Sequence, residues 1–222
     1  MQAANPRRGY ILGLSAYIIW GLFPIYFKAI AEVPAVEIII HRVLWSALFG
    51  ALLLMVWKHP GWLRELLDNP KRLAILALSG TLIAANWLTY VWSVNNGRML
   101  EASLGYYINP LVVIATGVIV LKEKMRPLQW LAVGTAAIGV GVLTFDYGRL
   151  PWIALGLALS WGSYGLVKKQ LGLGALEGLS IETLLSSGFY LGYLIWLGNS
   201  GEGQFSHSLQ LTLLLIGGGA VT

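Results

Sequence analysis

Long apolar stretches occupy almost the whole of this 222-residue chain, and only short connections separate them. A helix needs about 20 apolar residues to cross roughly 30 Å of hydrocarbon, and every stretch except the last is close to that length. Each of these stretches except the last is therefore long enough to cross a bilayer once as a helix. The sequence predicts transmembrane helices near residues 9–30, 35–57, 72–95, 101–121, 127–145, 151–171, 178–198 and 207–222.

The composition agrees with this pattern, since 57% of the residues are hydrophobic and only 11% are charged. Such a balance is typical of a polytopic membrane protein, so we predict an all-α fold with the lipid bilayer as its solvent. No connection is long enough to fold as a separate domain. The chain contains no cysteine, which excludes disulfides, thiolate nucleophiles and cysteine metal sites.

The Lys and Arg residues lie almost entirely on alternate connections, and this asymmetry predicts the orientation. Cytoplasmic loops carry an excess of these residues, so we place the N-terminus in the cytoplasm. A nucleic-acid site needs clustered cations, whereas the cations here lie on short connectors that face anionic lipid. The net charge of +5 therefore predicts no nucleic-acid partner. The cytoplasmic cations are then Arg7, Arg8, Lys58, Arg64, Lys71, Arg72, Lys122, Lys124, Arg126, Lys168 and Lys169, against Arg98 and Arg149 outside and Lys28 and Arg42 within the spans.

The two parts of the chain resemble each other at a shift of 141 residues. The shift superposes Leu14 on Leu155, Trp20 on Trp161, Gly21 on Gly162 and Lys28 on Lys169, and four further residues bring Glu37 opposite Glu182. A repeat of five spans is odd, so the second copy would be inverted in the membrane, as in many secondary transporters. We predict a first repeat over residues 1–146 and the start of an inverted second repeat over residues 147–222. We expect a fragment with about eight of ten helices.

Three sequence motifs point to a known family. The first span carries Trp20-Gly21 followed by Pro24, the fourth carries the run 101–111 with Asn109-Pro110, and Lys122-Glu123-Lys124 follows it. Together they resemble the RarD-type permeases of the EamA branch of the drug/metabolite transporter superfamily. The resemblance implies ten helices in two inverted halves, a central polar cavity and transport of small metabolites or drugs. It also implies a multi-pass protein of the bacterial cytoplasmic (inner) membrane.

Polar and aromatic side chains recur on single faces of the predicted helices, where they are candidates to line a substrate pathway. Asparagine amides both donate and accept hydrogen bonds, which suits a neutral binding group. The alternative is structural, because asparagine also bridges membrane helices and a lysine near a helix end reaches toward the interface. The candidate substrate-binding residues are Tyr17, Trp20, Lys28, Asn86, Tyr90, Tyr106, Asn109 and Trp161.

A second group of candidates is ionisable and suits coupling or gating. Glu37 and His41 are one helical turn apart with Arg42 beside them, which indicates a proton site or a packed histidine. One His and one carboxylate are too few to hold a metal, so no metal is expected. In the repeat, Lys28 with Glu37 and Lys169 with Glu182 would form one ion pair toward each membrane face, acting as latches.

We therefore predict a secondary transporter, an exporter of small metabolites or drug-like molecules that works by alternating access. The chain has no phosphate-binding GxxxxGK[ST] motif, so neither ATP nor a cofactor is expected, and protons are the candidate coupling ion. The sequence contains no set of catalytic groups that would converge in an active site, so we do not expect an enzyme. The alternative is a membrane scaffold or auxiliary subunit without transport activity. Gly188 and Gly192 form a GxxxG motif, which predicts close helix packing.

Overall fold

The computed structural model describes residues 6–57, 68–120, 122–146, 148 and 150–221, and in these ranges it contains helices and no strand. The predicted all-α fold is confirmed, and the helix ends differ from the expected ones by a few residues. Lys58, Arg64 and Arg149, which we used to assign the orientation, lie outside the described ranges. The helices are α1 Pro6–Ala29, α2 Ala35–Trp57, α4 Pro70–Asn95, α5 Met99–Ile119, α6 Pro127–Asp146, α7 Trp152–Leu171, α8 Ala175–Ser200 and α9 Leu209–Ala220.

Five of these helices, α1, α2, α4, α5 and α6, are long and apolar enough to cross a membrane. Several ends follow from local chemistry. Asn69 precedes α4, and its side-chain oxygen accepts a hydrogen bond from the Arg72 amide at 3.1 Å, which supplies a partner that the first helical turn lacks. Gly201 ends α8 with φ 76°, a left-handed conformation that costs glycine little.

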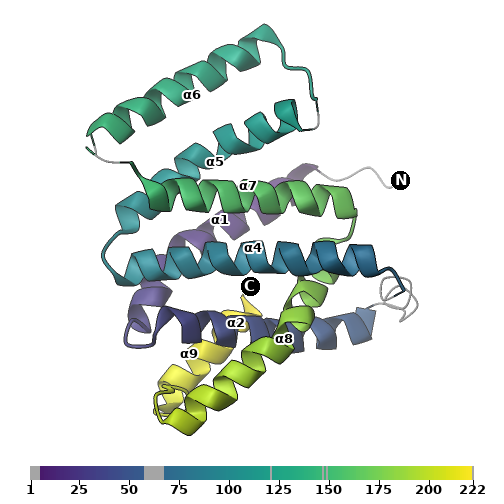
Figure 1. Cartoon of the computed structure of the whole chain (residues 1–222), viewed down its shortest axis with the longest axis vertical. Helices are drawn as coiled ribbons and strands as arrows, with labels where there is room; N and C mark the ends of the chain where they lie inside the picture. The colour runs from purple at the N-terminus through teal and green to yellow at the C-terminus, as the bar shows by residue number, and fades with distance from the viewer. Residues whose placement is uncertain (1–5, 58–67, 121, 147, 149, 222) are drawn as a thin grey trace.

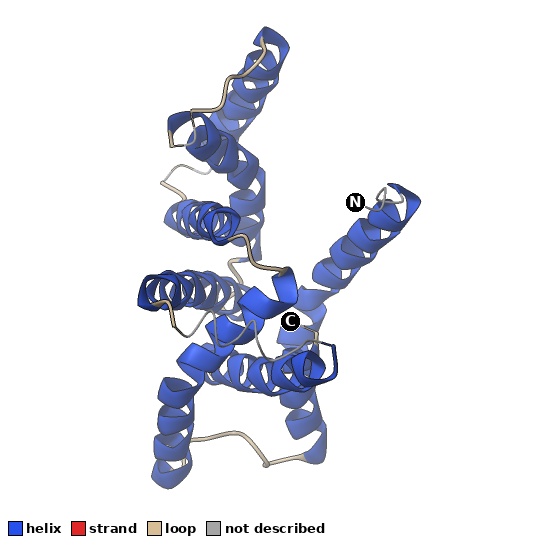
Figure 2. Cartoon of the chain, turned by 90° about the vertical axis from the view of Figure 1, so that its right-hand side faces the viewer, coloured by secondary structure: helices blue, strands red, loops and turns tan. Residues whose placement is uncertain are grey.

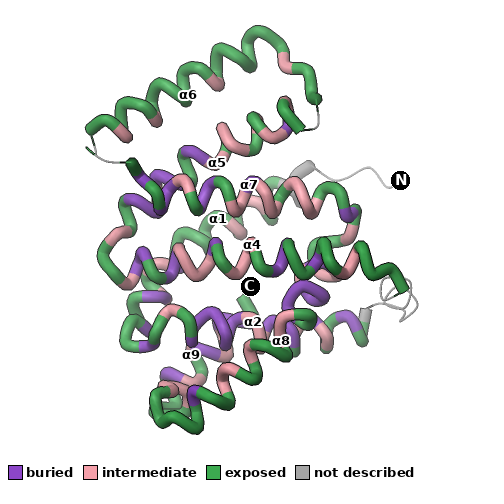
Figure 3. The backbone as a smooth tube through the Cα atoms, viewed as in Figure 1, coloured by how far each residue is buried: buried purple, intermediate pink, exposed green. Residues whose placement is uncertain are grey.

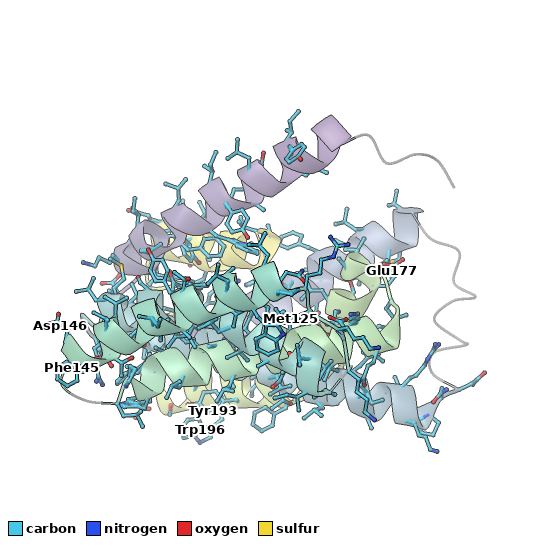
Figure 4. All side chains as sticks on the ribbon, turned by 90° about the horizontal axis from the view of Figure 1, so that it is seen from above. Met125, Phe145, Asp146, Glu177, Tyr193 and Trp196 are labelled. Carbon is cyan, nitrogen blue, oxygen red and sulfur yellow. The ribbon has the colours of Figure 1, made fainter. Side chains whose placement is uncertain are left out.

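The helices form two groups on either side of α4 (Figure 1). On one side α4 packs against α7, α7 against α5 and α5 against α6, and on the other side α2 contacts α4, α8 and α9. Helix α6 has no buried residue in its described part, and its exposure is visible along its length in Figure 3. Figure 4 labels Met125, in the connection just before this outer helix, and Phe145 in its last turn. The N-terminal part of α1 diverges from the other helices (Figure 2).

Small residues set the distances between the inner helices. A Cβ atom on Gly105 of α5 would lie 3.0 Å from the Ala154 carbonyl oxygen of α7, and one on Gly80 of α4 would lie 3.2 Å from the Glu182 carbonyl oxygen of α8. Such contacts are typical of membrane helices, where close backbone approach replaces the hydrophobic driving force. Gly188 and Gly192 pack against no described helix, contrary to our prediction, since both are exposed and a Cβ on either would meet nothing within 4 Å among the described residues.

Candidate substrate and coupling site

Two tryptophans at equivalent positions of the predicted repeat meet between α1 and α7. The rings of Trp20 and Trp161 are 6.1 Å apart and nearly perpendicular. Tyr17 makes a similar edge contact with Trp20 at 5.7 Å, and Tyr90 of α4 makes one with Tyr106 of α5 at 5.9 Å. Edge-to-face pairs hold aromatic rings in fixed orientations. The structure thus brings predicted substrate residues from different helices into contact.

The two predicted asparagines differ in their surroundings, although both line a cavity of about 10 Å³ between α4, α5 and α7. Asn86 donates from its amide nitrogen to the Leu157 carbonyl at 2.9 Å and to the Ser160 hydroxyl at 2.8 Å, and so joins α4 to α7. Asn109 has a buried amide oxygen that accepts no hydrogen bond from any described residue. Tyr106 and Trp161 complete this cavity wall. The free acceptor of Asn109 is therefore the better candidate to bind a solute.

Two larger cavities meet at Arg42. One, of about 50 Å³, is lined by α2, α4 and α8 and includes Glu182, whereas the other, of about 320 Å³, lies mainly between α1 and α9. The Arg42 side chain lines both of them and is only 4% exposed. Its guanidinium carbon is 3.8 Å from the centre of a Trp87 ring and 5.5 Å from the Phe23 ring, so cation–π attraction holds it in place.

Glu37 is buried at the start of α2 and binds the connection between α8 and α9. One carboxylate oxygen accepts hydrogen bonds from the backbone N–H groups of Gln204 at 2.8 Å and Phe205 at 3.1 Å. The same oxygen is 3.9 Å from Nε2 of His41, whose ring stacks on Phe205 with centroids 4.5 Å apart. The other Glu37 oxygen and His41 Nε2 are buried and hydrogen-bond to no described residue.

The predicted outer latch is not formed. Within the described residues, Lys28 makes no ion pair with Glu37; it is exposed in the last turn of α1 and lines none of these cavities. The physical reason is that the Glu37 carboxylate turns inward to two backbone amides, while a lysine at a helix end gains more from water and lipid headgroups. Lys28 therefore does not lie with the other predicted substrate residues.

The predicted inner latch uses the neighbouring lysine. Glu182 is buried, and its carboxylate accepts from Lys168 Nζ at 3.1 Å, from the Tyr164 hydroxyl at 3.2 Å and from the Ser79 hydroxyl. Lys169 instead pairs with Glu123 at 2.8 Å, where both side chains are exposed. Our pairing of Lys169 with Glu182 is thus wrong. The network joins α4, α7 and α8, and no group of three His, Asp or Glu side chains that could hold a metal occurs among the described residues.

Sequence reasoning missed several residues of the site. Lys168, Tyr164 and Ser79 hold Glu182, and Phe23 and Trp87 enclose Arg42. Trp87 follows Asn86 directly in the sequence, but one tryptophan among ten gives no signal by itself. Only the packing of α1 and α4 on α2 brings these rings to the guanidinium.

An apolar helical bundle with ionisable and aromatic side chains in its interior is typical of a multi-pass membrane protein, and comparison with known proteins identifies this one as a transporter. The model of the EamA-like transporter family matches residues 7–145. An uncharacterized transporter of Pseudomonas aeruginosa is 54% identical over 223 residues, covering 100% of this chain and 75% of the relative. The RarD protein of Escherichia coli is 46% identical over 223 residues, covering 100% of this chain and 75% of the relative. The chain belongs to the EamA-like transporter family and, within it, to the RarD type.

A more distant relative carries a more specific name. The chloramphenicol-sensitive protein RarD of Pseudomonas aeruginosa is 29% identical over 212 residues, which cover 94% of this chain and 71% of that protein. No solved structure matches this chain.

Proposed function

We propose that this transporter is a secondary exporter of small metabolites or drug-like molecules, located in the bacterial inner membrane and working by alternating access. The observation that carries the proposal is the cavity between α4, α5 and α7, where Tyr106 and Trp161 lie beside Asn109, whose amide oxygen accepts no hydrogen bond from a described residue. Trp20 of α1 contacts the Trp161 ring, and Tyr90 of α4 contacts the Tyr106 ring. Rigid rings bind the apolar body of a solute, and a few polar groups fix its orientation. Trp20 and Trp161 would form the part of this site shared by the two halves.

The helix contacts support an inverted repeat. The 141-residue shift equates α1 with α7, α2 with α8 and α4 with α9. Under this equivalence the contact of α2 with α9 corresponds to that of α8 with α4, and both occur. The contact of α4 with α7 corresponds to one of α9 with α1, where the Tyr26 hydroxyl donates to the Leu214 carbonyl at 2.9 Å. Rocking of two related halves about a central site is the usual basis of alternating access.

Protons are the proposed coupling ion, with Glu37 and His41 as the site that takes them up. This assignment is supported by the 3.9 Å separation of the carboxylate oxygen and the imidazole nitrogen, and by one buried atom on each side chain, Glu37 Oε2 and His41 Nε2, that hydrogen-bonds to no described residue. Glu37→Gln and His41→Gln should abolish accumulation driven by a pH gradient. Exchange of labelled for unlabelled solute needs no net proton movement and should persist. Loss of both activities in both variants would contradict coupling at this site.

The function is tested by uptake into proteoliposomes that contain the full chain, with labelled chloramphenicol and a panel of labelled aromatic metabolites. We expect saturable, counterflow-competent transport of at least one solute. Asn109→Leu should abolish it at unchanged expression, whereas Asn199→Leu, an exposed change near the end of α8, should not. A protein that transports nothing in the panel while remaining folded would favour the membrane scaffold.

A further inference from the structure

Helix α6 lies at the edge of the molecule, and its main contact is with α5 (Figure 1). It is long and apolar enough to cross a membrane, and none of its described residues is buried. A cavity of about 360 Å³ lies between α5 and α6 and ends at the connection that joins them. We call it the α5–α6 groove; its walls include Leu111, Ile114 and Val118 of α5 and Ala132, Val133 and Ala136 of α6.

The walls that the two helices give to this groove are apolar apart from one residue. The α5 wall runs from Val118 to Pro110, a distance of about 12 Å along the helix. On α6 the polar residue is Gln129, and its side-chain oxygen accepts a hydrogen bond from the Arg126 backbone N–H at 2.8 Å. Such walls suit an acyl chain. They do not select one lipid over another, because all lipid tails are about as apolar as leucine, so selection depends on the end of the groove.

The connection at the end of the groove is positively charged. Lys122, Lys124 and Arg126 are exposed, and none of them forms an ion pair within the part of the chain that the structure describes. Glu123 lies among them, but its carboxylate is 2.8 Å from Nζ of Lys169 in α7, so its charge is compensated there. The first turn of α6 adds no acidic side chain. This end of the groove therefore offers cations to an anionic group.

Two features suit the same end of the groove to the membrane surface. The charge distribution assigns this connection to the cytoplasmic side, where anionic lipids attract basic segments. Trp130, in the first turn of α6, is 54% exposed, and exposed tryptophans concentrate at the level of the lipid headgroups. Lys124 itself lines the groove, so the cation and the apolar walls belong to one continuous surface. A phospholipid combines the same two parts, an anionic phosphate and an acyl chain.

We propose that the α5–α6 groove binds an anionic phospholipid, whose phosphate contacts Lys124 together with Lys122 and Arg126 and whose acyl chain lies along the apolar walls. A lysine ammonium binds phosphate as a point charge. None of the residues that line the groove lines the cavity at Asn109. The lipid site is thus separate from the candidate substrate site and does not depend on the proposed transport function.

Three probes test the proposal on the full chain in a non-ionic detergent, with bound molecules counted by native mass spectrometry during a titration. They are palmitoyl-oleoyl phosphatidylglycerol, the phosphatidylcholine with the same two chains, and glycerol 3-phosphate. We expect the protein to bind one phosphatidylglycerol at least about tenfold more tightly than phosphatidylcholine, because its headgroup carries a net negative charge toward several cations. Glycerol 3-phosphate, which has no acyl chain, should not bind at the same concentrations.

Variants at the charged end locate the headgroup. Lys124→Gln should weaken phosphatidylglycerol binding about fivefold, the contribution of one lysine near an anionic group. Lys71→Gln is the matched control, because Lys71 is an exposed cation in the first turn of α4, is assigned to the same membrane face and does not line the groove. It should leave the binding unchanged.

Variants along the wall locate the acyl chain. Ala136→Leu fills the groove and should weaken the binding of both phospholipids, because it acts on the chain and not on the headgroup. Ala137→Leu is its control, since Ala137 is exposed on the same helix and is not part of the groove wall. If Lys124→Gln does not fold, this second pair of variants decides the matter together with the lipid comparison on the unmodified chain.

Several results would overturn the proposal. Equal binding of the two phospholipids, or equal losses in Lys124→Gln and Lys71→Gln, would assign the retained lipid to unspecific contacts. Unchanged binding in folded Ala136→Leu would remove the acyl chain from the groove, and tight binding of glycerol 3-phosphate would make this a site for a free phosphate compound. A dimer whose formation displaces phosphatidylglycerol would instead assign the groove to a second copy of the chain.

Discussion

Glu37 and Glu182 occupy equivalent places in the predicted repeat, yet their carboxylates are stabilised by different groups. Glu37 accepts from two backbone amides, which are neutral dipoles. Glu182 accepts from Lys168 and two hydroxyls, so its charge is balanced by a cation. Breaking these two arrangements should therefore have different costs, because a buried charge left without its counter-ion is penalised more than one that loses a neutral donor.

Lys168→Met tests this difference. Removing one partner of a buried ion pair typically costs about 3–5 kcal/mol, so the variant should unfold at a clearly lower temperature in detergent. Glu182→Gln in the same chain should restore most of the loss, since the amide can still accept from Ser79 and Tyr164. The control is Lys169→Met, whose exposed pair with Glu123 should contribute about 0–1 kcal/mol. Equal shifts for the two lysine variants would show that the Glu182 network is not a stabilising element.

The two asparagines of the candidate site make a second prediction at this scale. Asn86→Leu removes two interhelical hydrogen bonds and should destabilise the protein by about 1–2 kcal/mol. Asn109→Leu removes an acceptor that no described residue uses, and should leave the unfolding temperature unchanged or higher. Thermal unfolding measured beside transport separates the roles: Asn109→Leu should lose transport alone. A destabilised Asn109→Leu would assign that residue to packing.

Which of two adjacent lysines binds Glu182 could not be predicted from the sequence. Successive residues of an α-helix point about 100° apart, so Lys168 and Lys169 face different neighbours. The repeat superposes Lys28 on Lys169, but identity at equivalent positions says nothing about the rotation of α7 against α8. That rotation is set by packing contacts such as Gly178 of α8 against the Lys168 side chain. The sequence thus predicted that a lysine and a glutamate would be paired near this membrane face, but not which lysine pairs with Glu182.

At the scale of the helix, the contact of α5 with α7 depends on small residues. Gly105→Leu would place its Cβ against the backbone of Ala154 and the side chain of Leu157, where the nearest atoms leave 3.0–3.1 Å. The helices would have to separate, and we expect poor yield of folded protein or a large loss in unfolding temperature. Gly134→Leu in α6 is the control, since a Cβ there meets nothing within 4 Å. Size-exclusion profiles and thermal unfolding of both variants measure the effect, and similar behaviour of the two would contradict the close approach.

Helix positions followed from the sequence because a bilayer imposes one length on every span. Which helices pack against each other could not be predicted. Lipid tails and leucine side chains are equally apolar, so the hydropathy of a helix does not show which of its faces contacts another helix. The glycine motif illustrates the limit: Gly188 and Gly192 have the spacing of a packing motif but are exposed, whereas Gly105 belongs to no such motif and brings α5 close to the backbone of α7. The candidate cluster at Trp20, Trp161 and Asn109 was predictable as residue types, and its geometry required the fold.

For the whole molecule, the charge distribution predicts which loops face the cytoplasm. The chain has no cysteine, so single cysteines can be introduced without a background. Cysteine at Glu32 or Glu202 should react with an impermeant thiol reagent from outside, and cysteine at Asn69 or Lys124 only from the cytoplasm; all four positions are exposed. Labelling with the two groups reversed would overturn both the orientation and the inverted-repeat argument.

The hydrogen bonds of Glu37 reach 167 residues along the chain to Gln204. A membrane protein is inserted from its N-terminus as it is synthesised, so α2 enters the bilayer with Glu37 and Arg42 long before the amides of Gln204 and Phe205 exist. Charged residues cost about 2.5–3.5 kcal/mol at the centre of an inserting helix, and the apolar remainder of α2 has to offset that cost alone. With a mean hydropathy of 2.0, the highest of the five candidate spans, α2 is apolar enough to do so. What waits for synthesis of the connection between α8 and α9 is the pair of amide donors that the buried Glu37 carboxylate uses in the folded protein.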